Sequence, residues 1–172
     1  MPVPAGRVVK ARAFAEGMID SVITVADLAQ IAKSAWKVVH VDCFEPGEGY
    51  AEHAIDGKPD TFWHTTWSTG RPGHPHEIQV DLGKPTSMSG FSYLPRQDMA
   101  NGRIGRYEFY VSNDGKDWGR VVATGRFRNT SALQKVTFDK PATARFIRLV
   151  ALSEVVGQPY TTVAELDILP VE

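Results

Sequence analysis

The sequence predicts an all-β sandwich, and three observations support this prediction. From about Trp36 onward the chain consists of short segments in which polar and apolar residues alternate, the pattern of half-buried strands. Turn residues separate these segments at the spacing expected for a sandwich. Hydrophobic residues make up 42% and charged residues 23% of the 172 residues, which indicates one soluble globular domain rather than a disordered chain.

The strands follow from this alternation, taken in order along the chain. In 77–82, the side chains of Ile78, Val80 and Leu82 share one face. Asn113-Asp114-Gly115 follows a second alternating segment and predicts a hairpin turn, because Asp-Gly tolerates positive φ. We expect about eight strands in this part of the chain, at 37–42, 77–82, 88–94, 107–112, 120–123, 134–138, 145–151 and 163–169.

The first 35 residues do not share this rhythm. Two short strands are expected at 8–14 and 21–25, and a short helix at 27–35, where Leu28, Ile31, Ala32 and Ala35 form one stripe. We therefore divide the chain into an N-terminal extension, residues 1–35, which is a linker or the remnant of a preceding β domain, and a main module, residues 36–172.

Charge and composition exclude several classes of function. The chain has 19 Lys and Arg against 20 Asp and Glu, a formal net charge of −1, so nothing drives it toward nucleic acid or an anionic membrane. No apolar run approaches the roughly 20 residues that cross a bilayer, and the start of the chain lacks the pattern of a signal peptide. The single cysteine, Cys43, excludes an internal disulfide and a multi-cysteine zinc site. No catalytic motif is present, so we expect that the chain is not an enzyme. We also expect a monomer.

Five segments of the main module form a distinctive set of motifs. They are HAIDGKPDTFWHT (53–65), LPRQD (94–98) with NG (101–102), YVSNDGKDW (110–118), ARFIRL (144–149) and VAEL (163–166). Together they resemble the discoidin, or coagulation factor five/eight type C, family over about Trp36 to Leu169, in the family's order, and they are individually modest but jointly specific. The resemblance is closest to family thirty-two carbohydrate-binding modules, such as those of galactose oxidase and bacterial sialidases, and it implies a jelly-roll sandwich.

The resemblance implies a sugar site in two long loops, 43–76 and 94–104. Sugar hydroxyls need directional hydrogen-bonding groups, and the apolar face of the ring needs an aromatic plane. Glu45 competes with Glu48 for the place of a carboxylate, and Trp67 competes with Tyr160 for that of the stacking ring. The expected sugar-binding residues are Glu48, His64, Arg96, Asn101 and Tyr160.

The resemblance also implies a structural calcium ion that connects an early loop to the last strand. Asp56-Gly57, Thr61 and Glu165 supply hard oxygen donors, which Ca²⁺ prefers. The implied ligands are the carboxylates of Asp56 and Glu165, the hydroxyl of Thr61 and the main-chain carbonyls of His53, Lys58, Thr61 and Ala164.

A zinc site is a weaker hypothesis. His74 and His76 lie two residues apart and could share a metal with His53 or His64, but no third and fourth ligand is evident. We interpret these histidines as hydrogen-bonding loop residues.

The expected function is therefore non-catalytic binding of galactose, N-acetylgalactosamine or related terminal sugars. Segment 6–22 resembles the last strands of the small β domain of bacterial chitobiases and β-hexosaminidases, and comparable segments precede such modules in α-L-fucosidases. This implies a secreted parent glycoside hydrolase and an extracytoplasmic location. The alternative is a discoidin-like adhesion module that binds protein or phospholipid, which would need apolar loop tips.

Overall fold

Two long antiparallel strands form the centre of the fold, β5 (His76–Leu94) and β8 (Gln134–Ala151). The computed structural model describes residues 8–11, 24–27 and 32–171. In the main sheet the strands follow the order β10-β5-β8-β6-β7, and β3 also pairs with β5. The other members of this sheet are β3 (Lys37–Val41), β6 (Arg106–Ser112), β7 (Ala123–Arg126) and β10 (Glu165–Pro170).

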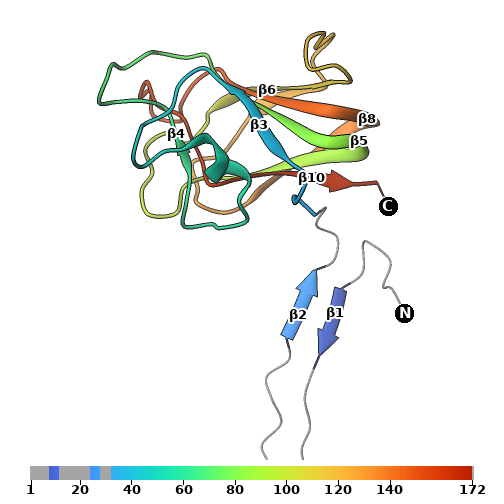
Figure 1. Ribbon diagram of the computed structural model, residues 1–172. Coiled ribbons are helices and arrows are strands. Elements are labelled where there is room, and N and C mark those ends of the chain that lie inside the picture. The colour runs from blue at the N-terminus through green and yellow to red at the C-terminus, as the bar shows by residue number, and fades with distance from the viewer. Residues whose placement is uncertain (1–7, 12–23, 28–31, 172) are drawn as a thin grey trace, which may run out of the picture.

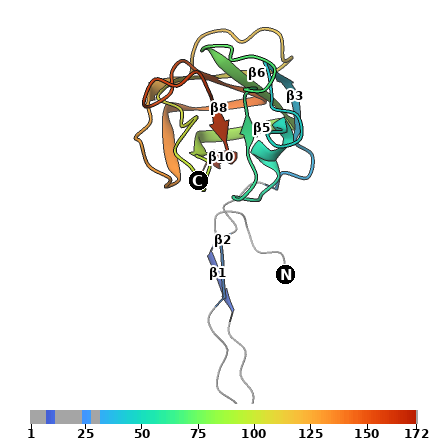
Figure 2. The same ribbon diagram turned by 90° about the vertical axis from the view of Figure 1, so that its left-hand side faces the viewer.

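Breaks in the pairing allow β5 to serve both layers of the sandwich. Its register with β8 shifts between Asp81 and Thr86 and again between Met88 and Gly90. The part before these shifts pairs with β3, and the part after them pairs with β10. The strands thereby surround one core, as the two perpendicular views show (Figures 1 and 2).

The core is rich in aromatic side chains. The rings of Phe91 and Phe109 stack with their centroids 4.1 Å apart, and those of Tyr107 and Phe127 stack at 4.2 Å. Trp63 is also buried, and its indole Nε1 donates a hydrogen bond to the Cys43 carbonyl at 2.9 Å. An aromatic core of this size fixes the strands from which the loops extend.

Short elements complete the described residues. A 3-10 helix, η1 (Ala51–Ile55), follows β3, and β4 (Trp63–His64) pairs with β9 (Thr162–Val163) in a two-stranded sheet. Near the N-terminus β1 (Val8–Ala11) pairs with β2 (Thr24–Asp27). Within the part of the chain that the structure describes, no helix has the length and apolar character needed to cross a bilayer.

The all-β prediction is confirmed, but several strand boundaries were wrong. The segments 77–82 and 88–94 belong to one strand, as do 134–138 and 145–151, because the backbone stays extended through the turn residues between them. The segment 163–169 is divided into β9 and β10, and the strand expected at 120–123 begins only at Ala123.

The N-terminal expectations were correct in part. Strands overlap both expected segments, at Val8–Ala11 and Thr24–Asp27, and residues 12–14 and 21–23 of these segments lie outside the described residues. The predicted helix 27–35 is not supported: Asp27 ends β2, and the Trp36 amide donates to the Lys33 carbonyl at 2.9 Å to close a turn. Residues 28–31 lie outside the described residues. The boundary at residues 35 and 36 stays a prediction.

Candidate functional site

Three loops meet beside the short β4–β9 sheet. His64 in β4 pairs with Thr162 in β9, and the Thr162 amide donates to the Gly102 carbonyl at 2.7 Å. Tyr160 lies just before β9, where the Thr65 amide donates to the Thr161 carbonyl at 3.0 Å. The strand β9 therefore holds the early, middle and late loops together at one end of the sandwich, the end that faces the viewer in Figure 2.

These loops enclose a cavity of about 270 Å³. It contains all of the sugar-binding residues expected from the sequence, together with Trp67 and Met99, which we had not assigned. Its lining is Glu48, His64, Trp67, Arg96, Met99, Asn101 and Tyr160. Trp67 had been considered only as a competitor of Tyr160. Met99 was not expected from the sequence to line the site, and it is 56% exposed.

Arg96 is held rigidly at the floor of the cavity. Its Nε and Nη2 atoms each donate to a carboxylate oxygen of Asp98 at 2.7 Å, and its guanidinium carbon lies 3.9 Å from the centroid of the Phe62 ring. The guanidinium carries five N–H donors. Two of them are directed at Asp98 and one at the side-chain oxygen of Asn101, at a long 3.4 Å. Arg96 therefore remains able to donate to a ligand oxygen.

His64 is a hydrogen-bond acceptor on the cavity wall. Its Nδ1 lies 2.6 Å from the Thr65 carbonyl oxygen, and a carbonyl only accepts, so Nδ1 carries the proton. Burial lowers the pKa of His64, and the positive charge of Arg96 lowers it further. The neutral ring therefore presents the lone pair of Nε2, which lies 3.5 Å from the Asn101 side-chain nitrogen.

The long contacts among these groups match the chemistry of a hydroxyl group. A hydroxyl donates one hydrogen bond and accepts others. Inserted here, it donates to His64 Nε2 and accepts from Arg96, while Asn101 offers a donor and an acceptor between them. Because the existing contacts at 3.4 and 3.5 Å are weak, a ligand hydroxyl replaces them at little cost.

Aromatic rings flank His64 on two sides. Its ring centroid lies 4.5 Å from that of Trp67 and 5.5 Å from that of Tyr160. Both aromatic side chains are partly exposed and line the cavity. Either ring offers an apolar plane beside the polar groups, so the choice between Tyr160 and Trp67 as the stacking residue stays open.

The two glutamates of the early loop have different environments. Glu48 is exposed and lines the cavity. Glu45 is 5% exposed, and its Oε2 accepts hydrogen bonds from the Thr66 hydroxyl and the amides of Trp67 and Ser68 at 3.1, 2.7 and 3.0 Å. Burial alone would raise the pKa of Glu45, but these hydrogen bonds lower it to about 2. Glu45 therefore orders the loop that carries Trp67.

His76 holds the late loop, which precedes β9 and carries Tyr160. Its Nε2 lies 2.8 Å from the Pro159 carbonyl oxygen, next to Tyr160, and its Nδ1 lies 2.7 Å from Asp42 Oδ2. Burial opposes a charge on His76, but its hydrogen bonds to Asp42, Cys43 and Pro159 raise its pKa to about 10. His76 is therefore an imidazolium that donates through both nitrogens, to Asp42 and to Pro159.

Two of the residues expected to bind calcium line a second cavity, of about 570 Å³, whereas His53, Lys58, Thr61 and Ala164 are not among the residues that line it. Asp56 and Glu165 both line it. Asp56 accepts from the Lys58 amide at 2.9 Å and from the Thr61 hydroxyl at 2.8 Å, and the Thr61 hydroxyl oxygen also lies 3.0 Å from the Lys58 carbonyl oxygen. His53 lies in η1, and Ala164 directly precedes Glu165 in β10.

The chemistry of this set fits a calcium ion. The carboxylates of Asp56 and Glu165, the hydroxyl of Thr61 and main-chain carbonyl oxygens are hard oxygen donors. Glu165 Oε1 is buried and has no hydrogen-bond partner among the described residues. The other oxygen of Glu165 pairs with Lys33, which also donates to the Leu166 carbonyl at 3.0 Å. An ion bound here would compete with Lys33 for Glu165.

Comparisons with known proteins agree with this architecture. Residues 34–166 match the F5/8 type C domain family. The chain is 45% identical to a sialidase of Micromonospora viridifaciens over 150 residues, which cover 85% of the chain and 22% of the sialidase. The chain thus spans about a fifth of the length of the curated relatives that it matches first.

Two solved structures have the same fold. The family 32 module of NanJ from Clostridium perfringens, in complex with galactose, is 33% identical with a TM-score of 0.72, and the match covers 81% of this chain and 97% of that one. The C-terminal domain of a chitobiase from Bacteroides fragilis is 31% identical with a TM-score of 0.74, covering 83% and 97%. The chain therefore belongs to the F5/8 type C, or discoidin, family and is a non-catalytic carbohydrate-binding module of family 32.

Proposed function

We propose that the chain binds terminal galactose or N-acetylgalactosamine in the cavity between Glu48 and Tyr160. The observation that carries this proposal is the arrangement of Arg96, Asn101 and His64, in which a donor and an acceptor converge on the position of one hydroxyl. The relative solved with galactose supports the choice of sugar class.

The polar wall of the cavity, formed by His64, Arg96 and Asn101, and the aromatic ring of Tyr160 have separate roles in this proposal. Arg96 and His64 recognise the axial O4 hydroxyl, whose orientation distinguishes galactose from glucose. Tyr160 stacks on the apolar face of the sugar ring. The hydrogen-bonding side chains of Glu48, His64, Arg96 and Asn101 all line this cavity, which favours a sugar over the phospholipid or protein ligand of a discoidin-like adhesion module.

Binding is expected to be weak. A monosaccharide buries little area, and water already satisfies its hydroxyls, so each hydrogen bond contributes about 1 kcal/mol. The expected Kd is on the order of 0.1–1 mM. Isothermal titration calorimetry with galactose, N-acetylgalactosamine, N-acetylglucosamine, fucose and glucose measures both affinity and specificity.

Three variants test the roles of the residues. Arg96→Ala is expected to abolish measurable binding, because it removes the charged donors. His64→Ala is expected to reduce the preference for galactose over glucose, and Tyr160→Ala to weaken both sugars alike. The matched control is Arg145→Ala: Arg145 also forms a two-pronged ion pair with an aspartate, Asp81, at 2.8 Å, but outside the cavity.

The proposal fails if Arg96→Ala remains folded and binds galactose as the unaltered chain does. Unchanged galactose affinity in both His64→Ala and Tyr160→Ala would likewise place the sugar elsewhere. Binding of the chain to phosphatidylserine vesicles, in the absence of any response to sugars, would favour the adhesion alternative.

We also propose a structural Ca²⁺ held by Asp56, Thr61, Glu165 and the main-chain carbonyls of His53, Lys58 and Ala164. Two observations support this proposal: a buried oxygen of Glu165 has no hydrogen-bond partner in the described part of the chain, and the carboxylate of Asp56 lies beside the same cavity. An ion that binds only the folded state stabilises it by RT ln(1 + c/Kd), where c is the free ion concentration.

Chelation tests the calcium proposal. In a sample shown by elemental analysis to contain calcium, EDTA is expected to lower the melting temperature of the chain, and Asp56→Ala is expected to lower it without changing contacts to sugar. Asp60→Ala, an exposed aspartate of the same loop, is the control. An unchanged melting temperature after complete removal of calcium would contradict the structural role.

Finally, we propose that the parent protein is an extracytoplasmic glycoside hydrolase that this monomeric module holds near its glycan. The sialidase and chitobiase relatives support this proposal. Retention of the full-length parent on a galactose-bearing glycan column, and its loss with Arg96→Ala, would support the role. Equal retention of both proteins would contradict it.

A further inference from the structure

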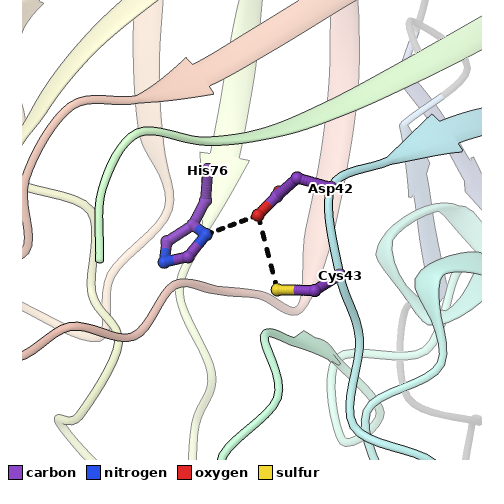
Figure 3. A group of neighbouring side chains, drawn as sticks. All are labelled: Asp42, Cys43 and His76. Carbon is purple, nitrogen blue, oxygen red and sulfur yellow. Dashed lines mark hydrogen bonds and ion pairs between the residues drawn. The ribbon is translucent and has the colours of Figure 1, made fainter. Parts of the chain in front are cut away.

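Three side chains of metal-binding types converge where β3 ends and β5 begins. Asp42 and Cys43 follow β3 directly, and His76 is the first residue of β5. Figure 3 shows the Asp42 carboxylate between the imidazole of His76 and the thiol of Cys43. One nitrogen, one oxygen and one sulfur atom all lie within 4.8 Å of one another.

The backbone fixes this arrangement. Strands β3 and β5 pair in antiparallel register through Val41 and Ile78, so the residues just beyond this pair face each other. The Glu77 amide donates to Asp42 Oδ1 at 2.8 Å, which leaves Oδ2 directed at His76. The Cys43 carbonyl accepts the indole N–H of buried Trp63 at 2.9 Å.

His76 already has the support that a metal-binding histidine needs. Its Nε2 is directed at the Pro159 carbonyl at 2.8 Å, and a ligating histidine generally donates its second N–H to such a carbonyl. Nδ1 then faces Asp42 and Cys43. The side chain of His76 is fully buried, whereas that of Asp42 is 29% exposed, so the cluster has a rigid base and is open to solvent on one side.

We propose that Asp42, Cys43 and His76 form a binding site for a divalent metal of the zinc type, with water as the remaining ligand. Zn²⁺ binds His nitrogen and Asp oxygen at about 2.0–2.2 Å and Cys sulfur at about 2.3 Å, generally with four ligands. Asp42 Oδ2 lies 2.7 Å from His76 Nδ1 and 3.4 Å from Cys43 Sγ. A small rotation of the Asp42 carboxylate opens the space for the ion.

Metal binding at this site exchanges protons for the ion. The thiol of Cys43 gives up its proton to become a thiolate, and His76 gives up the proton on Nδ1, while Asp42 is already ionised. The mixture of a soft sulfur and a nitrogen ligand selects Zn²⁺ or Co²⁺ over Ca²⁺, which prefers oxygen ligands.

The only cysteine of the chain provides the test. In reduced, metal-free protein, the reaction of Cys43 with a thiol reagent such as Ellman's reagent is measured with and without Zn²⁺. We expect Zn²⁺ to slow this reaction about tenfold or more, because the bound thiolate is shielded, and Ca²⁺ to leave it unchanged. Co²⁺ is expected to produce a sulfur-to-cobalt charge-transfer band in the near ultraviolet.

Matched variants locate the site. Cys43→Ser should abolish the cobalt band, and Asp42→Asn should weaken the protection of Cys43 by Zn²⁺. Glu77→Gln removes a neighbouring carboxylate that pairs with His40 and Arg148 instead, and it should behave like the unaltered chain. Circular dichroism and melting curves confirm that each variant is folded.

Two results would overturn the proposal. The first is a Cys43 reaction rate that Zn²⁺ does not change in the folded, unaltered chain. The second is a cobalt spectrum without a sulfur band, together with equal Zn²⁺ binding by Cys43→Ser, which would place the metal on surface histidines.

Discussion

Replacing Gly49 with alanine tests how closely the early loop packs on β4. A Cβ atom at position 49 would lie 2.7 Å from the Cβ of His64 and 2.8 Å from its backbone nitrogen and oxygen. These atoms belong largely to the backbone, which also accepts the Glu45 amide and donates to the Gly49 carbonyl. The added methyl group therefore cannot be accommodated by rotating one side chain.

The size of the effect follows from this contact. Overpacking of this kind typically costs about 1–3 kcal/mol of the free energy of unfolding. For a chain of this size that corresponds to a decrease of about 2–12 °C in melting temperature. If β4 moves by a few tenths of an ångström, the hydrogen bond proposed between His64 and the sugar weakens, and galactose affinity falls by up to about fivefold.

Thermal denaturation and a galactose titration of the same sample measure both consequences. Gly73→Ala is the matched control, since an added Cβ there has no heavy atom within 4 Å, and it should leave both quantities unchanged. A Gly49→Ala protein with the melting temperature and galactose affinity of the unaltered chain would refute the proposed packing.

Two further predictions concern the polar wall. Asp98→Ala should weaken galactose binding about three- to tenfold, because Asp98 orients Arg96. It should change the free energy of unfolding by less than about 1 kcal/mol, because the Asp98 side chain is 58% exposed; a large drop in melting temperature with normal affinity would contradict this. Galactose affinity should be equal at pH 7.5 and pH 6.5, because burial and Arg96 lower the pKa of His64 despite the opposing charges of Glu48 and Glu45. A weakening of galactose binding between pH 7.5 and pH 6.5 would show that His64 is not neutral there. In the unfolded chain the His64 ring takes up a proton near pH 6.5, so His64 also lowers the free energy of unfolding as the pH falls below that value.

Alternation and turn residues identified the strands well but their ends poorly. The expected strand 77–82 ends before the turn residues Gly83-Lys84-Pro85, yet β5 continues through them. What the turn residues interrupt is the pairing with β8, since the register shifts between Asp81 and Thr86. The turn residues here therefore mark the place where β5 passes from one layer to the other. The local sequence pattern alone does not distinguish such a passage from a reversal of the chain.

The residues that line the cavity proposed to bind sugar were predictable in part. The resemblance identified His64, Arg96 and Asn101, which the structure brings within hydrogen-bonding reach of one another. The role of Glu45 was not predictable, because its three donors lie more than twenty residues away.

The cluster around His76 was also missed, and its partners had been sought among other histidines. Asp42 and Cys43 are brought to His76 by the register between β3 and β5. Neither spacing along the chain nor residue type contains that information.

The direction of β10 determines how the module responds to a mechanical load. β10 runs from Glu165, opposite Leu94, to Pro170 at the far end of the sandwich from β4 (Figure 1). A sugar bound to Arg96 as proposed would load the end of β5 that leads into the cavity, and a load applied at Pro170 would act in the opposite direction. The hydrogen bonds between antiparallel strands are perpendicular to them, so such a force shears the whole ladder at once instead of opening it one bond at a time. A load applied between the cavity and Pro170 would therefore be resisted by all the hydrogen bonds between β5 and β10 together.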